Sequence, residues 1–474
     1  MEPTTDTQRS DADGELVVQI LQPEISELIA KRNFASLRRV VEDWTPADLG
    51  DLLSLLEKDE RVILFRLLPK DNQIDVFEYL EWDAQYDLIK AMGDERFKDI
   101  LNDMSPDDRT ALLEELPASI TKRLLQQLSP EERSVAKTLL GYPDESVGRL
   151  MTPDYLAVKK NWSVREALDY VREHGEDSET LNILYVVDDA GKLVDDLKIR
   201  EFLLAPLDAR VEDLSDGSFQ CLNAFDDQEE AVETFKRYDR IALPVTDSEG
   251  ALIGIVTVDD VLDVAEEEAT EDFHKMGGVE ALDVPYSRAP LFDMIKKRAG
   301  WLSVLFLGEA LTTFVMTLFD DLTSKAIVLT VFLPLIISSG GNSGSQTATL
   351  VIRALSLGEI KLKDWRVVMT REMISGLTLG AILAIIGFGK IAGLHYAYGA
   401  YGDHWALIGA TVGLTLVGIV LWGAVMGSLF PLILERLGFD PATSSAPFVA
   451  TMVDVTGLVI YFSIAYAVLS GTLV

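Results

Sequence analysis

The first part of the chain repeats its apolar positions every twelve residues. In each repeat two apolar positions lie four residues apart, which places them on one face of a helix. The first register is Leu56, Leu68, Leu80, Met92, Met104, Leu116, Leu128 and Leu140, and the second is Leu52, Leu64, Val76, Leu88, Ile100, Leu112, Leu124 and Ala136. Ser or Thr followed by Pro, as at Ser105-Pro106 and Ser129-Pro130, is a helix-start signal. The pattern predicts short helices stacked into a solenoid over residues 21–141, after a polar, flexible terminus at 1–20.

The pattern changes to runs rich in Val and Ile after residue 141. The runs at 183–194 and 241–265 each contain a D-x-x-G turn, and each follows an amphipathic helical stretch, at 163–174 and 227–238. The same order therefore occurs twice, which predicts a tandem α/β domain of β-α-β-β-α units. The predicted boundaries are 142–206 for the first unit and 207–264 for the second.

The last part of the chain, residues 299–474, is predicted to be a membrane domain of five helices. Its apolar runs lie at about 300–319, 326–352, 367–392, 405–434 and 445–470, and each has the roughly 17–25 residues needed to cross a bilayer. Lys and Arg gather before the first run, after the second and between the fourth and fifth, which predicts a cytoplasmic N-terminus and an external C-terminus. Residues 265–298 begin as an acidic helix, break at Gly277-Gly278, and connect the two parts.

Charge is distributed unevenly along the 474 residues. Residues 1–290 carry 66 of the 77 acidic residues and 31 of the 42 basic ones, so the net charge of −35 falls entirely there. A surface this acidic repels nucleic acid and attracts cations. The single cysteine excludes an internal disulfide and a cysteine metal site. Because no H-E-x-x-H, G-x-S-x-G or P-loop pattern is present, we do not expect an enzyme.

Asp454 is the only charged residue between Ala446 and Leu469. A carboxylate at membrane depth costs at least a few kcal/mol on insertion scales, and such groups usually face a water-filled path or a partner. The alternative is a buried Asp hydrogen-bonded to a neighbouring helix. Glu309, in the first span, is a second intramembrane acid.

Two further segments have both a functional and a structural interpretation. The small and polar run SSGGNSGSQTATL (338–350) is either a pore wall or a close helix crossing. The acidic helix after the second α/β unit places like charges three and four residues apart, which destabilises a helix by a few tenths of a kcal/mol for each pair. A divalent cation with oxygen ligands would relieve that repulsion, and the alternative is a solvated face.

Three long motifs resemble the MgtE family of bacterial magnesium channels: GGNSGSQTATLVIRAL (340–355), PFVATMVDVTGL (447–458) and VTVDDVLDVAEEEATEDFHK (256–275). The resemblance covers nearly the whole chain. It implies a helical N domain, tandem CBS domains, a plug helix at 265–298 and a five-helix pore domain. It also implies a homodimer in the inner membrane that imports Mg²⁺ and is closed when cytosolic Mg²⁺ binds the acidic faces.

The resemblance also implies residue roles. Asp454, Asn342 and the carbonyl of Ala450 would lie along the ion path. The regulatory cation sites would use Asp107, Gly148 (by its carbonyl), Asp227, Glu229, Asp239, Asp260, Asp263, Glu268, Glu271 and Asp272. Some relatives bind ATP, for which Arg200 and Thr257 are the candidate contacts. The chain departs from the usual family pattern at Ser345 and Ala446, positions where Asn is common.

Two other functions are compatible with parts of the sequence. A membrane nucleotide sensor built on the CBS pair would bind adenine nucleotides tightly and pass no ions. A membrane-embedded hydrolase using Asp454 and Glu309 is disfavoured because no nucleophile–base pair is present. Oxygen ligands alone do not distinguish Mg²⁺ from Mn²⁺, Co²⁺ or Ni²⁺.

Overall fold

The computed structural model describes residues 11–472 except 43, 81, 283–285, 287 and 288. The chain divides into two compact units, and the division falls inside one helix, between Ala265 and Glu266. Residues 11–20, predicted as part of a flexible terminus, form the first half of helix α1 (Asp11–Ala30). Residues 1–10 of that predicted terminus lie outside the described residues.

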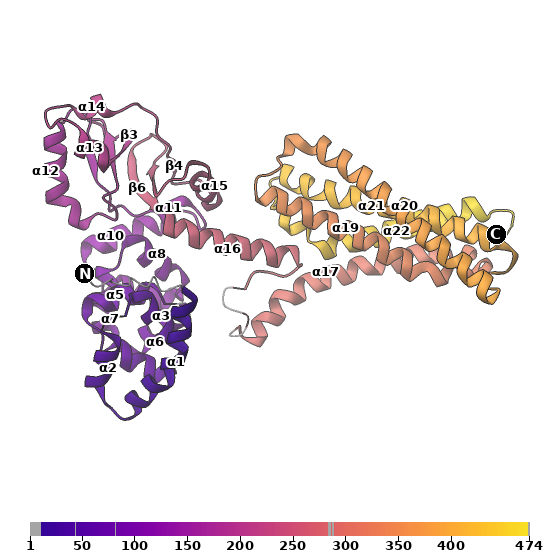
Figure 1. The fold of residues 1–474 in the computed structure, drawn as a ribbon, viewed down its shortest axis with the longest axis horizontal. Coiled ribbons are helices and arrows are strands. Elements are labelled where there is room, and N and C mark those ends of the chain that lie inside the picture. The colour runs from indigo at the N-terminus through magenta and orange to yellow at the C-terminus, as the bar shows by residue number, and fades with distance from the viewer. Residues whose placement is uncertain (1–10, 43, 81, 283–285, 287–288, 473–474) are drawn as a thin grey trace, which may run out of the picture. The chain divides into compact units, whose positions relative to one another are not determined.

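The first unit begins with the predicted helical solenoid (Figure 1). After α1, its helices are α2 (Phe34–Val41), α3 (Pro46–Leu55), α4 (Lys58–Phe65), α5 (Lys70–Glu78), α6 (Trp82–Met92), α7 (Asp94–Asp103), α8 (Pro106–Glu115), α9 (Ala118–Leu125) and α10 (Pro130–Leu139). From α3 to α10 every helix begins twelve residues after the one before. The second apolar register is buried throughout, and the first is buried except at Leu140, which is partly buried. The helical repeat predicted from the periodicity is therefore confirmed.

A third register of the repeat, which the apolar pattern did not indicate, consists of hydrogen-bond donors. The fourth residue of a helix reaches back to a carbonyl oxygen eight residues earlier, and in most cases also to one five residues earlier, at the C-terminal end of the preceding helix. Gln73 donates from Nε2 to the carbonyls of Phe65 (3.0 Å) and Leu68 (2.9 Å). The donors at this register are Arg61, Gln73, Gln85, Arg109, Thr121 and Arg133. These side chains satisfy carbonyls that a helix end leaves without an intrahelical partner.

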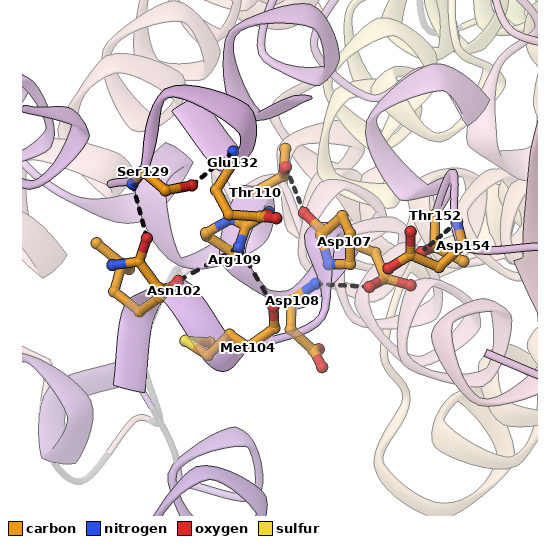
Figure 2. Close-up of polar contacts among 12 residues, drawn as sticks. Asn102, Met104, Asp107, Asp108, Arg109, Thr110, Ser129, Glu132, Thr152 and Asp154 are labelled. Carbon is orange, nitrogen blue, oxygen red and sulfur yellow. Dashed lines mark hydrogen bonds and ion pairs between the residues drawn. The ribbon is translucent and has the colours of Figure 1, made fainter. Parts of the chain in front are cut away.

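Arg109 is the fully buried member of this register (Figure 2). It donates from Nη1 to the carbonyls of Leu101 and Met104 at 3.3 Å, and its Nη2 forms an ion pair with Glu132. We expect Arg109→Met to lower the free energy of unfolding by about 2–3 kcal/mol, because it leaves two carbonyls and a half-buried carboxylate without their donor. Arg172→Met, which removes an exposed pair with Asp169, should cost under about 0.5 kcal/mol. Urea titrations followed by circular dichroism compare the two; equal midpoints would contradict the prediction.

The second half of this unit is the predicted tandem α/β domain. After α11 (Val147–Leu150), its first half contains β1 (Ala157–Lys159), α12 (Val164–His174), η1 (Gly175–Asp177), β2 (Ile183–Val187), β3 (Leu193–Lys198) and α13 (Ile199–Leu204). Its second half contains α14 (Val211–Leu214), β4 (Leu222–Asn223), α15 (Gln228–Tyr238), β5 (Ala242–Thr246), β6 (Leu252–Thr257) and the start of α16 (Val258–Met276). Each half has a three-stranded sheet whose first pair is parallel and whose second pair is antiparallel.

The two D-x-x-G turns join the halves to each other. Asp188 and Asp247 each accept hydrogen bonds from two backbone N–H groups of their own turn. Lys192 and Ala251, just beyond the turns, form an antiparallel bridge. Gly191 and Gly250 have φ of 80° and 82°, which glycine adopts without steric cost. The repeated turn motif thus sets the approximate symmetry of the pair.

The second unit holds the membrane-type helices. Its elements are the end of α16, α17 (Leu291–Leu318), α18 (Asp320–Lys325), η2 (Ile327–Phe332), α19 (Leu333–Ser356), η3 (Leu362–Asp364), α20 (Trp365–Tyr398), η4 (Gly402–His404), α21 (Trp405–Arg436), η5 (Pro441–Ser444) and α22 (Ala446–Leu469). Within the described residues five helical segments are long and apolar enough to cross a membrane, as predicted. The second span is not one uniform helix, because a 3₁₀ segment precedes Pro334 in the first turn of α19.

Glycines set the packing at the centre of the second unit. A Cβ added at Gly423 of α21 would lie 2.7 Å from the carbonyl oxygen of Gly340 in α19, and one at Gly380 of α20 would lie 2.8 Å from the Cα of Val417. No side chain fits at such distances, so the helices approach through their backbones. The glycine-rich run of α19 therefore does form the close crossing that was one of its two interpretations.

Candidate functional site

Asp454 lies on α22 opposite the glycine-rich run of α19. A Cβ added at Gly341 would come within 2.8 Å of Asp454 Oδ1 and 3.5 Å of the Ala450 Cβ. Glycine at 341 therefore leaves the space in which the carboxylate sits. Oδ1 is buried, and no hydrogen-bond partner for it exists among the described residues. The structural alternative, in which a neighbouring helix hydrogen-bonds this oxygen, is thus not what is observed.

The other two predicted path residues belong to the same helix contact. Ala450 is one turn before Asp454, and Asn342 directly follows Gly341. The Asn342 side chain is exposed and donates from Nδ2 to the Ser338 hydroxyl at 3.3 Å. The structure thus brings Ala450 and Asp454 to the contact of α22 with α19 at Gly341, whereas Asn342 lies next to this contact with its side chain exposed.

One face of α19 is polar and uncovered in the chain. Ser338, Asn342, Gln346 and Thr349 are exposed and follow helical spacing, while Gly340, Gly341 and Gly344 are buried on the other side. A polar stripe of this kind on a membrane helix is expected to face water or other polar groups rather than lipid. The run at 338–350 therefore packs through its glycines on one side and exposes polar groups on the other, and its interpretation as a pore wall stays a prediction.

Ser345 and Ala446, the pore-motif positions that depart from the family pattern, contact each other. The Ser345 hydroxyl donates a hydrogen bond to the carbonyl of Ala446 at 3.0 Å. This contact lies at the beginning of α22, about two turns before Asp454. The hydroxyl ties α19 to the first residue of the helix that carries the carboxylate.

A second group of carboxylates lies where the helical solenoid meets the tandem α/β domain, inside the first unit. Asp107 and Asp108 occupy the first turn of α8, and Asp259 and Asp260 occupy the first turn of α16. Helix N-termini favour acidic side chains, so each pair is locally well placed. The acidic seam is defined here as Glu78, Asp107, Asp108, Glu179, Asp259 and Asp260, which interact electrostatically.

The pKa values of several seam carboxyl groups are raised because these groups are buried close to one another. Burial, and then repulsion by Asp259 and Asp108, raises the pKa of Asp260 to about 7. Burial, followed by Asp108 and other acids, also raises the pKa of Glu78 to about 7. The pKa of Asp107 lies well above its usual range because the side chain is buried and because Asp260 is nearby. Burial and mutual repulsion therefore disfavour the charged forms of these carboxyl groups.

No basic side chain in the described part of the chain forms an ion pair with a seam carboxylate. Figure 2 shows the arrangement on α8: Arg109 points toward Met104 and Glu132, whereas Asp107 lies on the side of Thr152 and Asp154. The buried guanidinium of Arg109 is therefore used within the solenoid. Polar groups offset the charge only in part, for example the Ser105 hydroxyl that donates to Asp108 at 2.6 Å.

Only Asp107 and Asp260 of the seam were among the predicted regulatory residues. Glu78, Asp108, Glu179 and Asp259 were missed. A sequence signal exists for two of them, because adjacent acidic pairs follow both helix starts, in Ser105-Pro106-Asp107-Asp108 and in Thr257-Val258-Asp259-Asp260. Glu78 and Glu179 carry no such signal.

The remaining predicted regulatory residues of the first unit lie around α15 and α11, except Asp263, which lies on α16. Asp227 caps α15 and accepts a hydrogen bond from the Glu229 N–H at 3.0 Å, while Asp239 ends the helix with a φ of 49°. Gly148 is buried in α11, where a Cβ would lie 2.5 Å from the Tyr142 ring. Packing alone thus requires glycine at 148, and its carbonyl role stays a prediction.

In the second unit the predicted acids at the end of α16 have partners from the chain itself. Lys275 pairs with Glu271 at 2.5 Å and with Asp440 at 2.8 Å. Although burial alone would lower it, hydrogen bonds to Asp440 and Glu271 raise the pKa of Lys275 above its usual value. Burial raises the pKa of Asp272, which accepts a hydrogen bond from Ser356. The predicted residue Glu268 lies on the same helix.

The predicted nucleotide contacts are not joined by any hydrogen bond in the described residues. Thr257 is buried, and its hydroxyl donates to Asp260 at 2.6 Å and also contacts Asp259. Arg200 lies on α13, in the other half of the pair. Across the described residues, no three His, Cys, Asp or Glu side chains are arranged to enclose a metal ion. Any cation at the seam would thus be held by few carboxylates and by water.

Comparisons with known proteins cover most of the chain. Family models match at residues 44–145 (MgtE intracellular N domain), 147–207 and 211–267 (CBS domain), and 333–464 (divalent cation transporter). The chain is 40% identical over 350 residues to a magnesium transporter MgtE of Thermus thermophilus, covering 74% of this chain and 76% of the relative. It is 33% identical over 336 residues to the Enterococcus faecalis protein of the same name, covering 71% and 72%.

Among solved structures, the chain is similar to a cytosolic domain of the Mg²⁺ channel MgtE in complex with ATP. The identity is 35%, the match covers 52% of this chain and all of that one, and the TM-score is 0.49.

Proposed function

The chain belongs to the MgtE family of magnesium transporters, and from this membership we propose that it is a Mg²⁺-selective channel of the bacterial inner membrane. Asp454 is the observation that carries the proposal. Its carboxylate lies within the fifth span, beside the space left by Gly341, and has a buried oxygen for which the described residues supply no partner. A cation is the natural partner for such a group.

The ion path we propose suits a hydrated cation. Mg²⁺ binds oxygen ligands, gives up its water reluctantly and is usually held by one or two carboxylates. Asp454 would supply the charge, and the carbonyl of Ala450 and the amide of Asn342 would contact the ion's water. The polar stripe of α19 supports this path because it continues on both sides of Asn342. A homodimer would place two copies of these groups around one axis.

We propose that the acidic seam senses cytosolic Mg²⁺ and that its occupation closes the path. Without a cation, repulsion among buried carboxylates opposes contact between the solenoid and the CBS pair. Bound Mg²⁺ would remove that repulsion. Several ions that each favour the closed form by about 1 kcal/mol would approach the roughly 5.5 kcal/mol needed to move an equilibrium from 1:99 to 99:1. The acids of α15 and α16 would add further sites.

The raised pKa values of the seam predict a pH dependence with a definite sign. The folded seam binds protons more tightly than the unfolded chain, because the pKa values of Glu78 and Asp260 are about 7 instead of 4.5 and 3.8. With a chelator present, the contribution of these two carboxyl groups to the free energy of unfolding should be complete below about pH 4. It should be lost as the pH rises through 7. Urea titrations at several pH values measure this. Mg²⁺ should reverse the loss at pH 7, and a stability that Mg²⁺ leaves unchanged at that pH would contradict a cation at the seam.

The five spans and the family membership make the chain a multi-pass membrane protein. We propose that the N-terminal unit is cytoplasmic, which suits its acidic surface and the basic residues at Lys296, Lys297 and Arg298. Because the number of spans is odd, the C-terminus would then lie on the external side of the membrane. Mg²⁺ would be imported if it passes through the path into the cytoplasm down its concentration gradient.

Flux in reconstituted vesicles tests the proposal. Vesicles that contain the purified chain and a trapped Mg²⁺-sensitive dye should report Mg²⁺ entry at low internal Mg²⁺, and entry should stop as Mg²⁺ on the cytoplasmic side reaches millimolar concentration. Empty vesicles provide the baseline. Tight binding of an adenine nucleotide with no flux under any condition would instead favour the nucleotide sensor.

A further inference from the structure

Glu309 is an intramembrane acid that the proposed ion path does not yet use. It lies on α17 eight residues after Trp301 and nine before Leu318, so about 12–14 Å of helix separates it from either end of the apolar run predicted at about 300–319. That depth lies inside a hydrocarbon core about 30 Å thick. The side chain is exposed in the chain. A carboxylate facing lipid at this depth would cost at least a few kcal/mol, so its exposed side requires water or a polar partner.

The register of α17 against α22 places Glu309 level with Asp454. Trp301 donates from Nε1 to the Ser445 hydroxyl at 3.0 Å, and a Cβ added at Gly308 would lie 2.8 Å from Thr451 Cγ2. In these two contacts the residue number increases along both helices, so α17 and α22 run in the same direction. Extending the register by one residue puts Glu309 opposite residues 452–453, within about 3 Å of the level of Asp454. The two carboxylates also repel each other electrostatically.

The two flanks of α17 differ in chemistry at the depth of Glu309. The stripe that packs against the rest of the unit is partly or fully buried and contains Trp301, Leu305, Gly308, Thr312 and Val315. At about 100° per residue, Glu309 and Thr313 fall on one side of this stripe, together with the apolar Leu302 and Phe306 nearer its start. The other side is exposed and apolar, with Val304, Leu307, Leu311, Phe314 and Leu318. The apolar flank suits lipid, and the flank of Glu309 suits a polar space at that depth.

We propose that Glu309 faces the same water-filled path as Asp454 and is a second carboxylate that attracts the transported divalent cation. The inference rests on the proposed ion conduction. Asp454 supplies charge from α22, and Glu309 supplies it from α17 at the same depth. Two carboxylates that share a hydrated Mg²⁺ no longer repel each other, so the cation stabilises the arrangement in which both are ionised.

Cysteine labelling tests whether the flank of α17 that carries Glu309 is accessible to water. The one native cysteine, Cys221, is exposed and is first replaced by Ser. In that background Thr313→Cys should react with a membrane-impermeant, charged methanethiosulfonate, and Mg²⁺ should slow the reaction. Leu311→Cys, at a similar depth on the apolar flank, is the matched control and should stay unreacted. Equal labelling of the two cysteines, or none at Thr313→Cys, would overturn the proposal.

Flux measurements test the charge itself. In the same vesicles, Glu309→Gln should raise the Mg²⁺ concentration for half-maximal flux about tenfold while leaving the maximal flux near that of the unmodified chain, because a lost attraction is overcome by more cation. Glu309→Asp keeps the charge and should restore the half-maximal concentration. Unchanged flux in Glu309→Gln, or equal loss in both variants, would overturn the role of the carboxylate. If the unmodified chain passes no Mg²⁺, the proposed function fails instead, and labelling still reports whether the flank is wet.

Discussion

Asp454→Asn is expected to reduce Mg²⁺ flux to the baseline of empty vesicles. Asparagine keeps the shape of the side chain and the space beside Gly341, so the change removes charge with little effect on packing. Two unit charges 4 Å apart attract by about 4 kcal/mol at an effective dielectric constant of 20, and a divalent ion doubles this. Losing even a fraction of that attraction would weaken Mg²⁺ binding, and reduce the flux, a hundredfold or more. Dye-loaded vesicles with equal amounts of folded protein provide the measurement.

Glu372→Gln is the matched control for this variant. Glu372 is also an acid within a spanning helix, but it lies on α20 and accepts a hydrogen bond from the Thr347 hydroxyl at 3.1 Å, which glutamine can still accept. We expect its flux to stay within about twofold of the unmodified chain. Selective Mg²⁺ flux retained by Asp454→Asn would refute the assignment of Asp454 to the ion path.

Neutralising the acidic seam is expected to leave the transporter open at internal Mg²⁺ concentrations that close the unmodified chain. The double variant Asp107→Asn, Asp260→Asn removes one carboxylate from each side of the contact and keeps both helix starts polar. With fewer charges to bind, Mg²⁺ loses its preference for the closed form, and the concentration for half-maximal closure should rise at least about tenfold. Patch-clamp records with Mg²⁺ varied on the cytoplasmic side measure this shift.

Asp169→Asn provides the control for the seam variant. Asp169 is an exposed acid on α12 that pairs with Arg172, and it lies outside the seam. We expect closure by Mg²⁺ to be unchanged in this variant. Full closure of the seam variant at the usual Mg²⁺ concentration would contradict the sensing role of Asp107 and Asp260.

Local patterns predicted the fold because each element is marked by a few neighbouring residues. The twelve-residue spacing of leucines predicts a helix start every twelve residues, and the observed starts follow that spacing from Pro46 to Pro130. The two D-x-x-G turns at Asp188 and Asp247 mark equivalent hairpins of the two α/β halves. Long apolar runs likewise predict spans, since a bilayer requires a minimum helix length.

The candidate sites were predictable only where one residue is conspicuous by itself. Asp454 stands alone in an apolar run, so its cost in a membrane is visible without any structure. The seam as a whole does not stand out in this way: acidic pairs mark its two helix starts, but acidic residues are common throughout residues 1–290 and a generic charge run is usually solvated. Glu78 and Glu179 join the seam only because distant parts of the chain fold against each other.

The sequence by itself determined the repeat, the tandem α/β domain, the five spans and the acid in the last span, because periodicity, turn chemistry and hydropathy are properties of neighbouring residues. The tertiary structure decided which groups meet. It brought Gly341 to Asp454, Ser345 to Ala446, and the acidic helix starts of α8 and α16 to each other. These contacts form between residues that are distant in the sequence. The burial that raises the pKa of Asp260 therefore exists only in the folded chain.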